Sequence, residues 1–397
     1  MALFAGLGLS AVTAAPAAYV PAPEPVDTGR YLVGAVMCPL WNDGKRWTKI
    51  EPYPDRKPLL GWYDEGDPEV TDWEIKWALD HGISFFLACW YREPGSTAEA
   101  IVRPGLDHWI KGLQRSRFHD KFKFAIMWEN ANKFYSAPTT EEDFLGKLVP
   151  FWIESYFRRA DYLLVDGRPV FSIFNPATFV RELGGEAQAA AALEKMRLAC
   201  VQAGFPGIYI LGQSCWGKPL ELTEQAEQIQ RLGLDNSWAY HWPTFTGAFG
   251  GKLNPTGAEA IAAQERLWRT QPPPNVLTLS MGWDEAPWHF KYSKVQWRLT
   301  PAEFKVLAQK AKAVMDQRSG VGLECRLVLL DNWNEFGEGH YILPTQEHGF
   351  GYLDAIREVF APGAPAHIDL TPGEIGRGPY DRNYRAWILS QPAPAVK

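Results

Sequence analysis

Two glutamates, Glu335 and Glu338, lie three residues apart in the segment Asn334-Glu335-Phe336-Gly337-Glu338-Gly339. If this loop makes one helical turn, their side chains point the same way, with Cβ atoms about 5–6 Å apart. Neighbouring carboxylates push each other's pKa values apart, so that one can hold a proton at neutral pH while the other stays ionised. Cleavage of a glycosidic bond needs such an acid and base. The alternative is two solvent-facing glutamates on a loop. The position after the last expected strand, beside Trp and Asn, disfavours this alternative. Gly337 and Gly339 would also leave room for a ligand to approach closely.

The elements that must position this pair follow from an alternation of short apolar runs with longer amphipathic stretches. Eight strands are expected, at residues 31–38, 83–90, 122–128, 168–174, 208–212, 234–240, 276–281 and 326–331. Helices are expected near residues 69–81, 98–115, 140–160, 186–203, 221–232, 257–270, 301–316 and 350–360. Nearly continuous apolar strands are typical of a parallel sheet covered on both faces. Eight strand–helix units favour a single-domain α/β fold, the (β/α)8 TIM barrel, over an open doubly wound sheet. No glycine-rich phosphate-binding pattern follows the first strand.

Polar and aromatic residues follow six of these strands. In a (β/α)8 barrel the active site forms where strands end and the next loops begin, so these residues should converge on one pocket. Glu335 and Glu338, after the eighth strand, are the predicted catalytic residues. The predicted substrate-binding residues are Trp90, Tyr91, Trp128, Glu129, Asn130, Tyr240, Trp283, Asp284, Asn334 and His340.

The aromatic members of this set have two interpretations. The chain contains 18 Trp, and flat indole rings match the apolar faces of sugar rings, while a buried indole must also find a partner for its N–H. The rings of Trp90, Trp128 and Trp283 are therefore expected either as stacking platforms or as core residues. Tyr91 and Tyr240 could bind sugar hydroxyls or stabilise charge.

The polar residues among the predicted substrate-binding residues also have more than one interpretation. Glu129 and Asp284 could bind sugar hydroxyls, or Glu129 could be the acid of a conventional pair with Glu335. Asn334 could orient Glu335. His340 has a structural interpretation as well as a catalytic one, as a lone histidine usually does. Asp64, Glu65 and Asp67 are expected to cap and brace the turn before the first long helix.

Composition limits the partners. The chain has 397 residues, 46% of them hydrophobic, with a net charge of -6 and no run of Lys or Arg, so nucleic acid is not an expected partner. The five Cys show no CxxC pair and no zinc-binding spacing, so no metal and no organic cofactor is expected. Cys38, Cys89 and Cys325 are expected as buried thiols, and a Cys200–Cys215 disulfide stays possible.

The ends of the chain are expected to lie outside the catalytic unit. Residues 1–28 are interpreted as a signal-peptide-like segment followed by a Pro-rich linker, with a disordered tail as the alternative. Residues 29–365 form the expected catalytic barrel, and residues 366–397 a C-terminal extension. This organisation predicts a secreted or periplasmic protein. No segment is long and apolar enough to span a membrane.

Four segments resemble the family 99 glycoside hydrolases and the related WbsX-like proteins. Residues 334–339 are similar to the Asn-Glu-aromatic-x-Glu-Gly motif of that group. Residues 58–75 resemble the start of the family-99-like domain, and residues 128–132 resemble a Trp-x-Asn-Glu-Asn region, with Ala131 where Glu often stands. Residues 281–287 are similar to a Pro-Gly-aromatic-Asp segment, with Met281 in place of Pro. The resemblance covers roughly residues 31–360.

The resemblance implies a retaining glycoside hydrolase that acts on a carbohydrate without a covalent enzyme intermediate. The residue matching Glu335 takes the proton of the sugar 2-OH, so that this oxygen attacks C1 and forms a 1,2-anhydro sugar. The residue matching Glu338 protonates the leaving oxygen and then activates water. Family 99 enzymes act on α-mannosides, but His340 stands where they usually have Thr, which leaves the sugar open.

Two alternatives remain. One is the glycosyltransferase activity in polysaccharide synthesis that the WbsX-like name implies, although the sequence shows no DxD metal motif in a suitable loop and no phosphate cradle. The other is a non-catalytic sugar-binding barrel, which would not need both glutamates.

Overall fold

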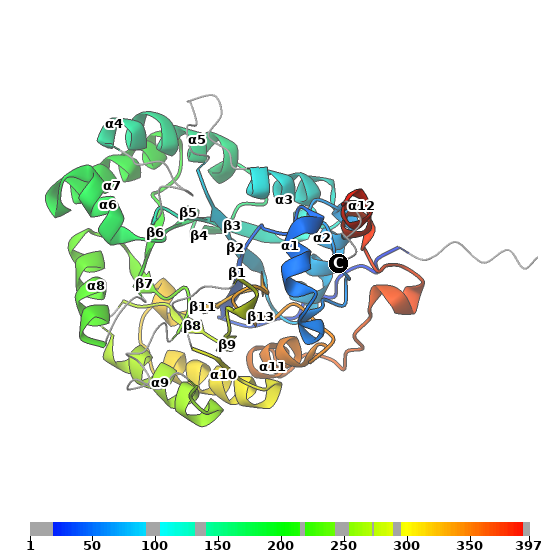
Figure 1. Ribbon diagram of the computed structural model, residues 1–397. Helices are drawn as coiled ribbons and strands as arrows, with labels where there is room; N and C mark the ends of the chain where they lie inside the picture. Colours follow the sequence, from blue (N-terminus) through cyan, green and yellow to red (C-terminus); the bar gives the residue numbers. More distant parts are fainter. Residues whose placement is uncertain are drawn as a thin grey trace, which may run out of the picture.

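A ring of eight parallel strands forms the centre of the molecule (Figure 1). The computed structural model describes residues 19–92, 104–131, 140–214, 219–242, 254–271, 274–288 and 295–391. The strands are β1 (Leu32–Met37), β2 (Phe85–Trp90), β3 (Lys123–Trp128), β5 (Arg168–Ile173), β6 (Tyr209–Gln213), β7 (Asn236–Trp238), β8 (Leu277–Leu279) and β11 (Leu327–Leu330). They hydrogen-bond in the order β7-β6-β5-β3-β2-β1-β11-β8, and a parallel bridge between Ser237 and Asn275 joins the two ends of this series. The predicted (β/α)8 barrel is confirmed.

The helices surround the barrel. The main helices are α2 (Pro68–Asp80), α3 (Pro104–Arg115), α7 (Glu186–Gln202), α8 (Pro219–Arg231), α9 (Gly257–Thr270), α10 (Pro301–Asp316) and α11 (Gly351–Phe360). Side chains cap the starts of α2, α9 and α10. Asp67 caps α2 as expected, because its side chain accepts a hydrogen bond from the Glu69 amide. A capping box of Thr300 and Glu303 begins α10. The expected start of the helix near 98–115 falls partly on residues 93–103, which lie outside the described residues.

The helix expected near 140–160 is present but irregular. It begins at Thr140, whose side chain accepts a hydrogen bond from the Asp143 amide, and runs through α4 (Glu141–Asp143), η3 (Phe144–Leu148), α5 (Val149–Trp152) and η4 (Ile153–Phe157). The η3 and η4 segments are π-helical. Pro150 lies between them and has no N–H to donate, so the regular α-helical ladder is interrupted there.

Several short elements were not predicted because their runs are too short to show a period. They are α1 (Gly44–Ile50), α6 (Pro176–Leu183), α12 (Arg382–Ser390), β4 (Leu164–Val165), the β9–β10 pair (Gly282–Trp283 and Trp297–Arg298) and the β12–β13 pair (Asn334–Glu335 and His340–Tyr341). Single helical turns form η1 (Pro54–Arg56), η2 (His119–Lys121), η5 (Ala286–Trp288), η6 (Leu323–Cys325) and η7 (Pro372–Ile375).

The two described chain ends pack on α2. On one side, Val26 N donates to Leu79 O and Lys76 Nζ donates to Ala22 O. On the other, Trp77 Nε1 donates to Leu370 O at 2.9 Å. In the described part of the chain, no helix is long and apolar enough to cross a membrane.

Four cysteines are buried thiols, namely Cys38, Cys89, Cys200 and Cys325. This confirms the expectation for the first two and for Cys325, which lies in η6 just before the strand rather than in it. Cys215 lies outside the described residues, so its pairing with Cys200 stays a prediction.

We expect Gly34→Ala to lower the free energy of unfolding by about 1–3 kcal/mol, because overpacking a core displaces its neighbours. A Cβ at this position of β1 would lie 2.1 Å from the ring of Phe85 on β2. Urea unfolding followed by circular dichroism measures the change. Gly146→Ala is the matched control, since nothing lies within 4 Å of its added Cβ and alanine favours helix. Equal stability of Gly34→Ala and the wild type would contradict the packing described for these strands.

Candidate active site

A short hairpin at the C-terminal end of the barrel carries both predicted catalytic glutamates. In β12 and β13, Asn334 pairs with Tyr341 and Glu335 pairs with His340. Residues 336–339 form the turn, so the expected single helical turn is wrong. Glu338 lies in the turn and Glu335 in the strand that leads to it.

The hairpin is fixed to the end of β1. Trp333 N donates to Val36 O at 2.6 Å, and Trp41 Nε1 donates to Asn334 O at 2.9 Å. The Asn334 side-chain oxygen accepts from Cys38 N at 2.9 Å. Asn334 was expected as a residue that could orient Glu335, and no hydrogen bond from its side chain to the Glu335 carboxylate is found among the described residues. Instead it anchors the backbone of the strand that carries Glu335.

The two glycines of the motif are explained by protein neighbours rather than by a ligand, which corrects the expectation from sequence. A Cβ at Gly337 would lie 1.8 Å from the Trp288 indole. At Gly339 the backbone has a φ of 76°, and a Cβ would lie 2.8 Å from the Asp284 backbone. Asp284 N also donates to Glu338 O at 2.7 Å. Close packing on the loop after β8 therefore sets the position of the turn.

Glu335 is almost fully buried, with 4% of its surface exposed. Its Oε1 accepts hydrogen bonds from Trp288 Nε1 and from Gly337 N, both at 3.2 Å. Burial is the largest influence and, together with the nearby Glu338 carboxylate, raises the pKa of Glu335 to about 7, although His340 and the hydrogen bonds act in the opposite direction. The two carboxylates therefore interact, as the spacing predicted.

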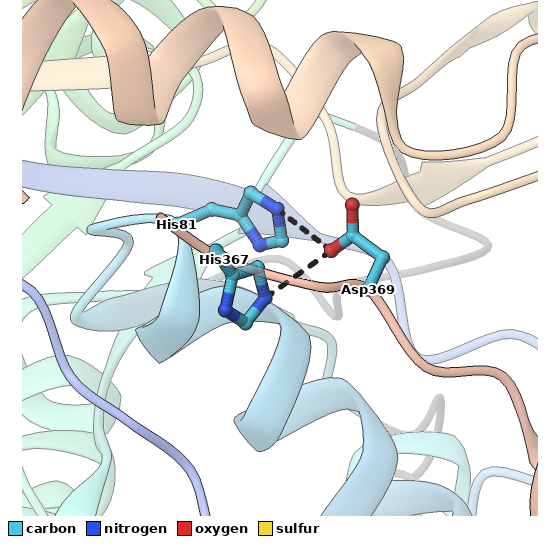
Figure 2. Close-up of side chains that lie close together, drawn as sticks. All are labelled: His81, His367 and Asp369. Atoms are coloured by element: carbon cyan, nitrogen blue, oxygen red, sulfur yellow. Dashed lines mark ion pairs between the residues drawn. The ribbon is translucent and has the colours of Figure 1, made fainter. Parts of the chain in front are cut away.

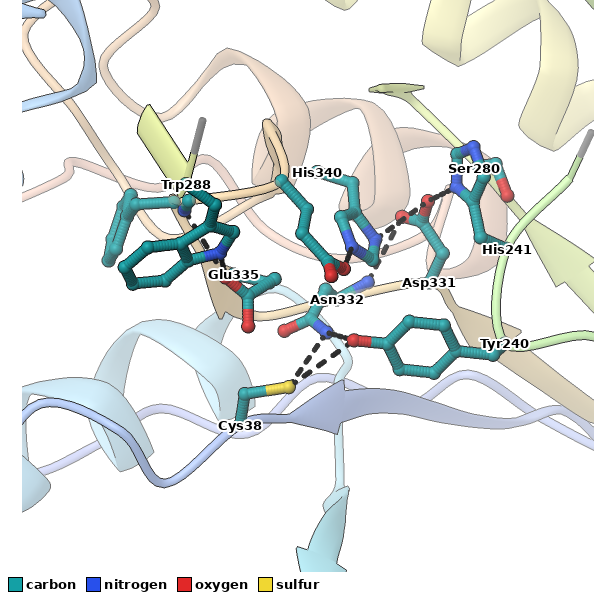
Figure 3. Close-up of polar contacts among 12 residues, drawn as sticks. Cys38, Tyr240, His241, Ser280, Trp288, Asp331, Asn332, Glu335 and His340 are labelled. Carbon is teal, nitrogen blue, oxygen red and sulfur yellow. Dashed lines mark hydrogen bonds and ion pairs between the residues drawn. The ribbon is translucent and has the colours of Figure 1, made fainter. Parts of the chain in front are cut away.

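A series of buried titratable groups, His241, Asp331 and His340, lies behind the hairpin (Figure 3) and ends at Glu338. His241 Nδ1 lies 2.8 Å from Asp331 Oδ2, and His340 Nδ1 lies 3.4 Å from the same oxygen. The other ring nitrogen of His340, Nε2, lies 2.9 Å from Glu338 Oε2. The side chains of Asp331, His241 and His340 are 0% exposed, whereas that of Glu338 is 21% exposed. Glu338 is thus the member of this series of side chains that faces solvent.

The pKa values of these groups depend on the balance between burial, which disfavours the charged form, and the neighbouring charged partners. Burial alone would lower the pKa of His340, but the carboxylates of Asp331 and Glu338 outweigh it and raise that pKa to about 10. Burial lowers the pKa of His241 more than Asp331 raises it. For Asp331, the two imidazoles outweigh burial and lower its pKa. At neutral pH, His340 is a buried cation between two carboxylates.

His340 therefore contacts one of the two predicted catalytic glutamates, so it is more than a structural residue of the core. His241, Asp331 and His340 also place their ligand atoms within 4.8 Å of one another. However, one Asp331 oxygen already binds His241 at a hydrogen-bond distance, and His340 directs its other nitrogen to Glu338. We interpret this group as a relay of ion pairs and hydrogen bonds.

A second network lies beneath the hairpin. Asn332 Nδ2 donates to Tyr240 Oη at 3.2 Å and to Cys38 Sγ at 3.3 Å. Figure 3 shows these three side chains from different elements meeting below His340. Burial raises the pKa of Tyr240, so its hydroxyl stays protonated. Tyr240, predicted to bind substrate, has its hydroxyl held by protein groups and its ring 5.3 Å from that of His340.

Two of the predicted stacking platforms belong to the core, which corrects that part of the prediction. Trp90 and Trp128 are both 0% exposed. Trp90 Nε1 donates to Tyr156 Oη at 3.1 Å, and the ring of Trp128 stacks on Phe144 with centroids 6.0 Å apart. A buried ring has no free face for a sugar, so these indoles support the strand ends instead.

The loop after β3 is built around its own polar groups. Asn130 Nδ2 donates to Asn175 O at 2.9 Å, and Asn130 Oδ1 accepts from Asn175 N at 2.7 Å. Asn130 therefore ties this loop to the one after β5 instead of facing a ligand. Glu129 is 8% exposed, and its Oε1 accepts from Ala131 N. Tyr91 is half-buried against the core.

The loop after β8 brings further residues to the hairpin. The ring of Trp283 lies 5.0 Å from that of His340 and 4.8 Å from that of His241. Asp284 forms an ion pair with Arg56, and its side chain stays 32% exposed. A cavity of about 290 Å³ lies beside it, lined by Arg56, Asp284, Gln296, Trp297, Arg298 and Gly339.

Sequence reasoning missed five residues that build the site: Trp288, His241, Asp331, Asn332 and Cys38. Their position at strand ends was the available signal, because Asp331 and Asn332 directly follow β11 and His241 follows β7. Their pairing has no sequence signature, since the partners come from different strands of the barrel. Trp288 is half-buried, and it presents its N–H to Glu335.

Comparisons with known proteins agree with this architecture. The structure of the GH99 endo-alpha-mannosidase from Bacteroides thetaiotaomicron in complex with BIS-TRIS-propane superposes with a TM-score of 0.56, at 12% identity, covering 92% of this chain and 100% of that one. At this identity the likeness establishes the fold. The uncharacterized protein WxcX of Xanthomonas campestris pv. campestris is 21% identical over 320 residues. That alignment covers 75% of this chain and 42% of WxcX, so the chain spans less than half the length of this relative.

An eight-stranded parallel barrel carries two interacting carboxylates after its last strand. The sequence matches the family described as "Glycosyltransferase WbsX" over residues 52–356. The chain belongs to this WbsX family, whose fold is that of the GH99 barrels.

The raised pKa of Glu335 gives a stability prediction. Between about pH 4.5 and pH 7 the folded protein holds a proton at Glu335 that the unfolded chain releases, so the free energy of unfolding falls as pH rises through this window. Glu335→Gln removes this loss. We expect the variant to gain stability relative to wild type between pH 5 and pH 8, by about 1–3 kcal/mol.

Urea unfolding at both pH values measures the difference. Glu142→Gln, at an exposed position of α4, should change stability equally at both. A pH-independent difference for Glu335→Gln would show that this carboxyl is not destabilised when ionised.

Proposed function

We propose that this chain is a retaining glycoside hydrolase that cleaves a bond in a polysaccharide or oligosaccharide. The observation that carries this proposal is the buried Glu335, whose pKa of about 7 is raised by burial and by Glu338, at the C-terminal end of the barrel. A catalytic base works best with a pKa near the operating pH. The similarity to the GH99 endo-alpha-mannosidase supports a carbohydrate as the substrate.

Glu335 is the proposed base toward the sugar 2-OH. Above about pH 7 it is ionised and can take the hydroxyl proton, so that the 2-oxygen attacks C1 while the bond from C1 to the leaving oxygen breaks. The indole N–H of Trp288 and the amide of Gly337 fix the acceptor oxygen before reaction. When the anhydro ring opens, Glu335 returns this proton to the 2-oxygen.

Glu338 is the proposed acid and base at the leaving group. It delivers a proton to the leaving oxygen and later takes one from the attacking water, as retaining enzymes require of one carboxyl group. The buried His340 cation, whose Nε2 lies 2.9 Å from Glu338, can supply and recover this proton. Asp331 holds His340 from its other nitrogen throughout. Export to the periplasm or beyond remains part of the proposal.

Glycosyl transfer is the second candidate, favoured by the description of the family. The acid–base groups would serve equally if a sugar hydroxyl, rather than water, accepted the glycosyl unit. The two functions differ in the donor, because a glycosyltransferase that uses nucleotide sugars releases a nucleotide. Incubating the protein with a panel of polysaccharides that includes α-mannans, without nucleotide sugar, separates them.

We expect Glu335→Gln and Glu338→Gln each to lower kcat/KM on a cleaved polysaccharide by about 10³-fold, with the circular dichroism spectrum unchanged, because each removes a proton-transfer group. Release of reducing ends measures turnover, and NMR of the first product reports whether the anomeric configuration is retained. Glu142→Gln is the control and should keep its activity. Wild-type turnover in Glu338→Gln would reject the assignment, and turnover that depends on a nucleotide sugar would favour the second candidate.

His340→Gln should move the pH profile. The cation of His340 lowers the pKa of Glu335, so its removal should shift the acidic limb of kcat/KM from near pH 7 to higher pH. Activity should also fall because Glu338 loses its proton partner. A pH series on the substrate found above measures the shift. If the acidic limb of kcat/KM stayed at the same pH, the group that titrates in this limb would not be Glu335.

A further inference from the structure

A second group of histidines and carboxylates lies at the opposite end of the barrel from the candidate active site. His81 is the C-cap residue that directly follows α2, and His367 and Asp369 come from the segment after α11. Figure 2 shows both imidazoles turned toward the Asp369 carboxylate. The ligand atoms of the three side chains lie within 4.8 Å of one another. No local spacing in the sequence announces this group, because its members are far apart in the chain.

The tautomer of His81 is fixed by the backbone. Its Nδ1 lies 2.7 Å from Trp77 O, a carbonyl that can only accept, so Nδ1 carries the proton. Its Nε2 makes no hydrogen bond, although the side chain is 0% exposed. In the neutral ring this nitrogen directs a lone pair at Asp369 Oδ1, which also makes no hydrogen bond. Two facing lone pairs repel, so the site requires a positive charge between them.

The spacing of these atoms suits a metal ion. His81 Nε2 lies 3.2 Å from Asp369 Oδ1 and 3.5 Å from Asp354 Oδ1. His367 Nε2 lies 3.3 Å from Asp369 Oδ1. Ligands at about 2.0–2.2 Å from a tetrahedral Zn²⁺ are separated by about 3.3 Å. A ring nitrogen fixed by a bond from its partner N–H to a backbone carbonyl is also the usual arrangement of a metal-binding histidine.

The local charges balance for a dication. The nearby Asp80 is neutralised by Lys76, whose Nζ lies 2.6 Å away. This leaves Asp354 and Asp369, whose two negative charges match the two positive charges of a dication. Asp354 is 46% exposed, so an ion could enter from its side. The group has the ligand types and the charge of a zinc site.

We propose that His81, His367 and Asp369 bind one Zn²⁺ beside the Asp354 carboxylate, and that this ion fastens the segment after α11 to the end of α2. The ion is structural, because the group lies at the N-terminal end of the barrel strands, away from Glu335 and Glu338. This part of a (β/α)8 barrel commonly serves stability rather than catalysis.

A protonated His81 is the competing occupant of the same space. Burial alone would lower the pKa of His81, but the nearby carboxylates of Asp354 and Asp369 and the bond from Nδ1 to Trp77 O outweigh it and raise that pKa to about 9. The proton and the metal ion satisfy the same need for positive charge. They differ in one measurable respect, since only the metal makes stability depend on zinc.

The test uses the full chain, stripped with EDTA and then desalted. After incubation with zinc and a second desalting step, we expect about one zinc per chain by mass spectrometry and a Tm about 3–6 °C above that of the stripped protein. Cobalt in place of zinc should give the intense visible absorption of a tetrahedral site. His367→Ala and Asp369→Asn should lose the metal and the zinc-dependent part of Tm.

His119→Ala, at an exposed histidine of η2, is the matched control and should bind zinc as the wild type does. His340→Gln removes a member of the relay in the candidate active site and should also leave zinc binding unchanged. Equal Tm with zinc and with EDTA, and no zinc retained by the wild type, would overturn the proposal in favour of a protonated His81. Zinc lost in His340→Gln but kept in His367→Ala would overturn it in favour of the other histidine group.

Discussion

The structure of the site depends on a positive charge buried between two carboxylates. His340 has no contact with solvent, and it lies 2.9 Å from Glu338 and 3.4 Å from Asp331. An isolated buried imidazolium would lose its proton, because burial disfavours the charged form. Here the two carboxylates hold the proton in place. The same cation limits how far the pKa of Glu335 rises, and its Nε2 lies 2.9 Å from the Glu338 carboxylate.

The barrel provides the rigidity that this arrangement needs. β1 and β11 are neighbours, and the segment after β11 is bonded to the end of β1 through Trp333, Asn334 and Cys38. The turn of the hairpin then packs on the loop after β8, where a side chain at Gly337 or Gly339 would collide. A carboxylate whose pKa depends on burial must be held where water cannot reach it, and contacts on both sides of the hairpin achieve this.

The sequence was sufficient for the barrel and its eight strands, because runs buried on both faces are apolar throughout. It also located Glu335 and Glu338 just after the last strand, and their catalytic role stays a prediction. The hairpin was not predictable, since strands of two residues show no alternation. Trp90 and Trp128 were ambiguous because a tryptophan at a strand end can turn either inward or toward the ligand, and only burial decides.

The two groups of histidines and carboxylates could not be predicted from the sequence, because their members come from distant segments. His241 and His340 meet at Asp331 only because β7 and β11 belong to the same barrel. His81 and His367 meet because the segment after α11 returns across the end of α2. In both cases the residue types are ordinary in the sequence, and their chemistry comes from contact in the folded chain.

The most direct test of the account is a titration of the Glu335 carboxyl carbon by ¹³C NMR, with Glu335→Gln used to assign the signal. The account predicts a pKa of about 7 that falls in Glu338→Gln, because the Glu338 carboxylate helps to raise it. A pKa at the ordinary value for glutamate, unchanged in Glu338→Gln, would show that the two carboxylates do not interact and would contradict the assignment of this hairpin as the catalytic centre.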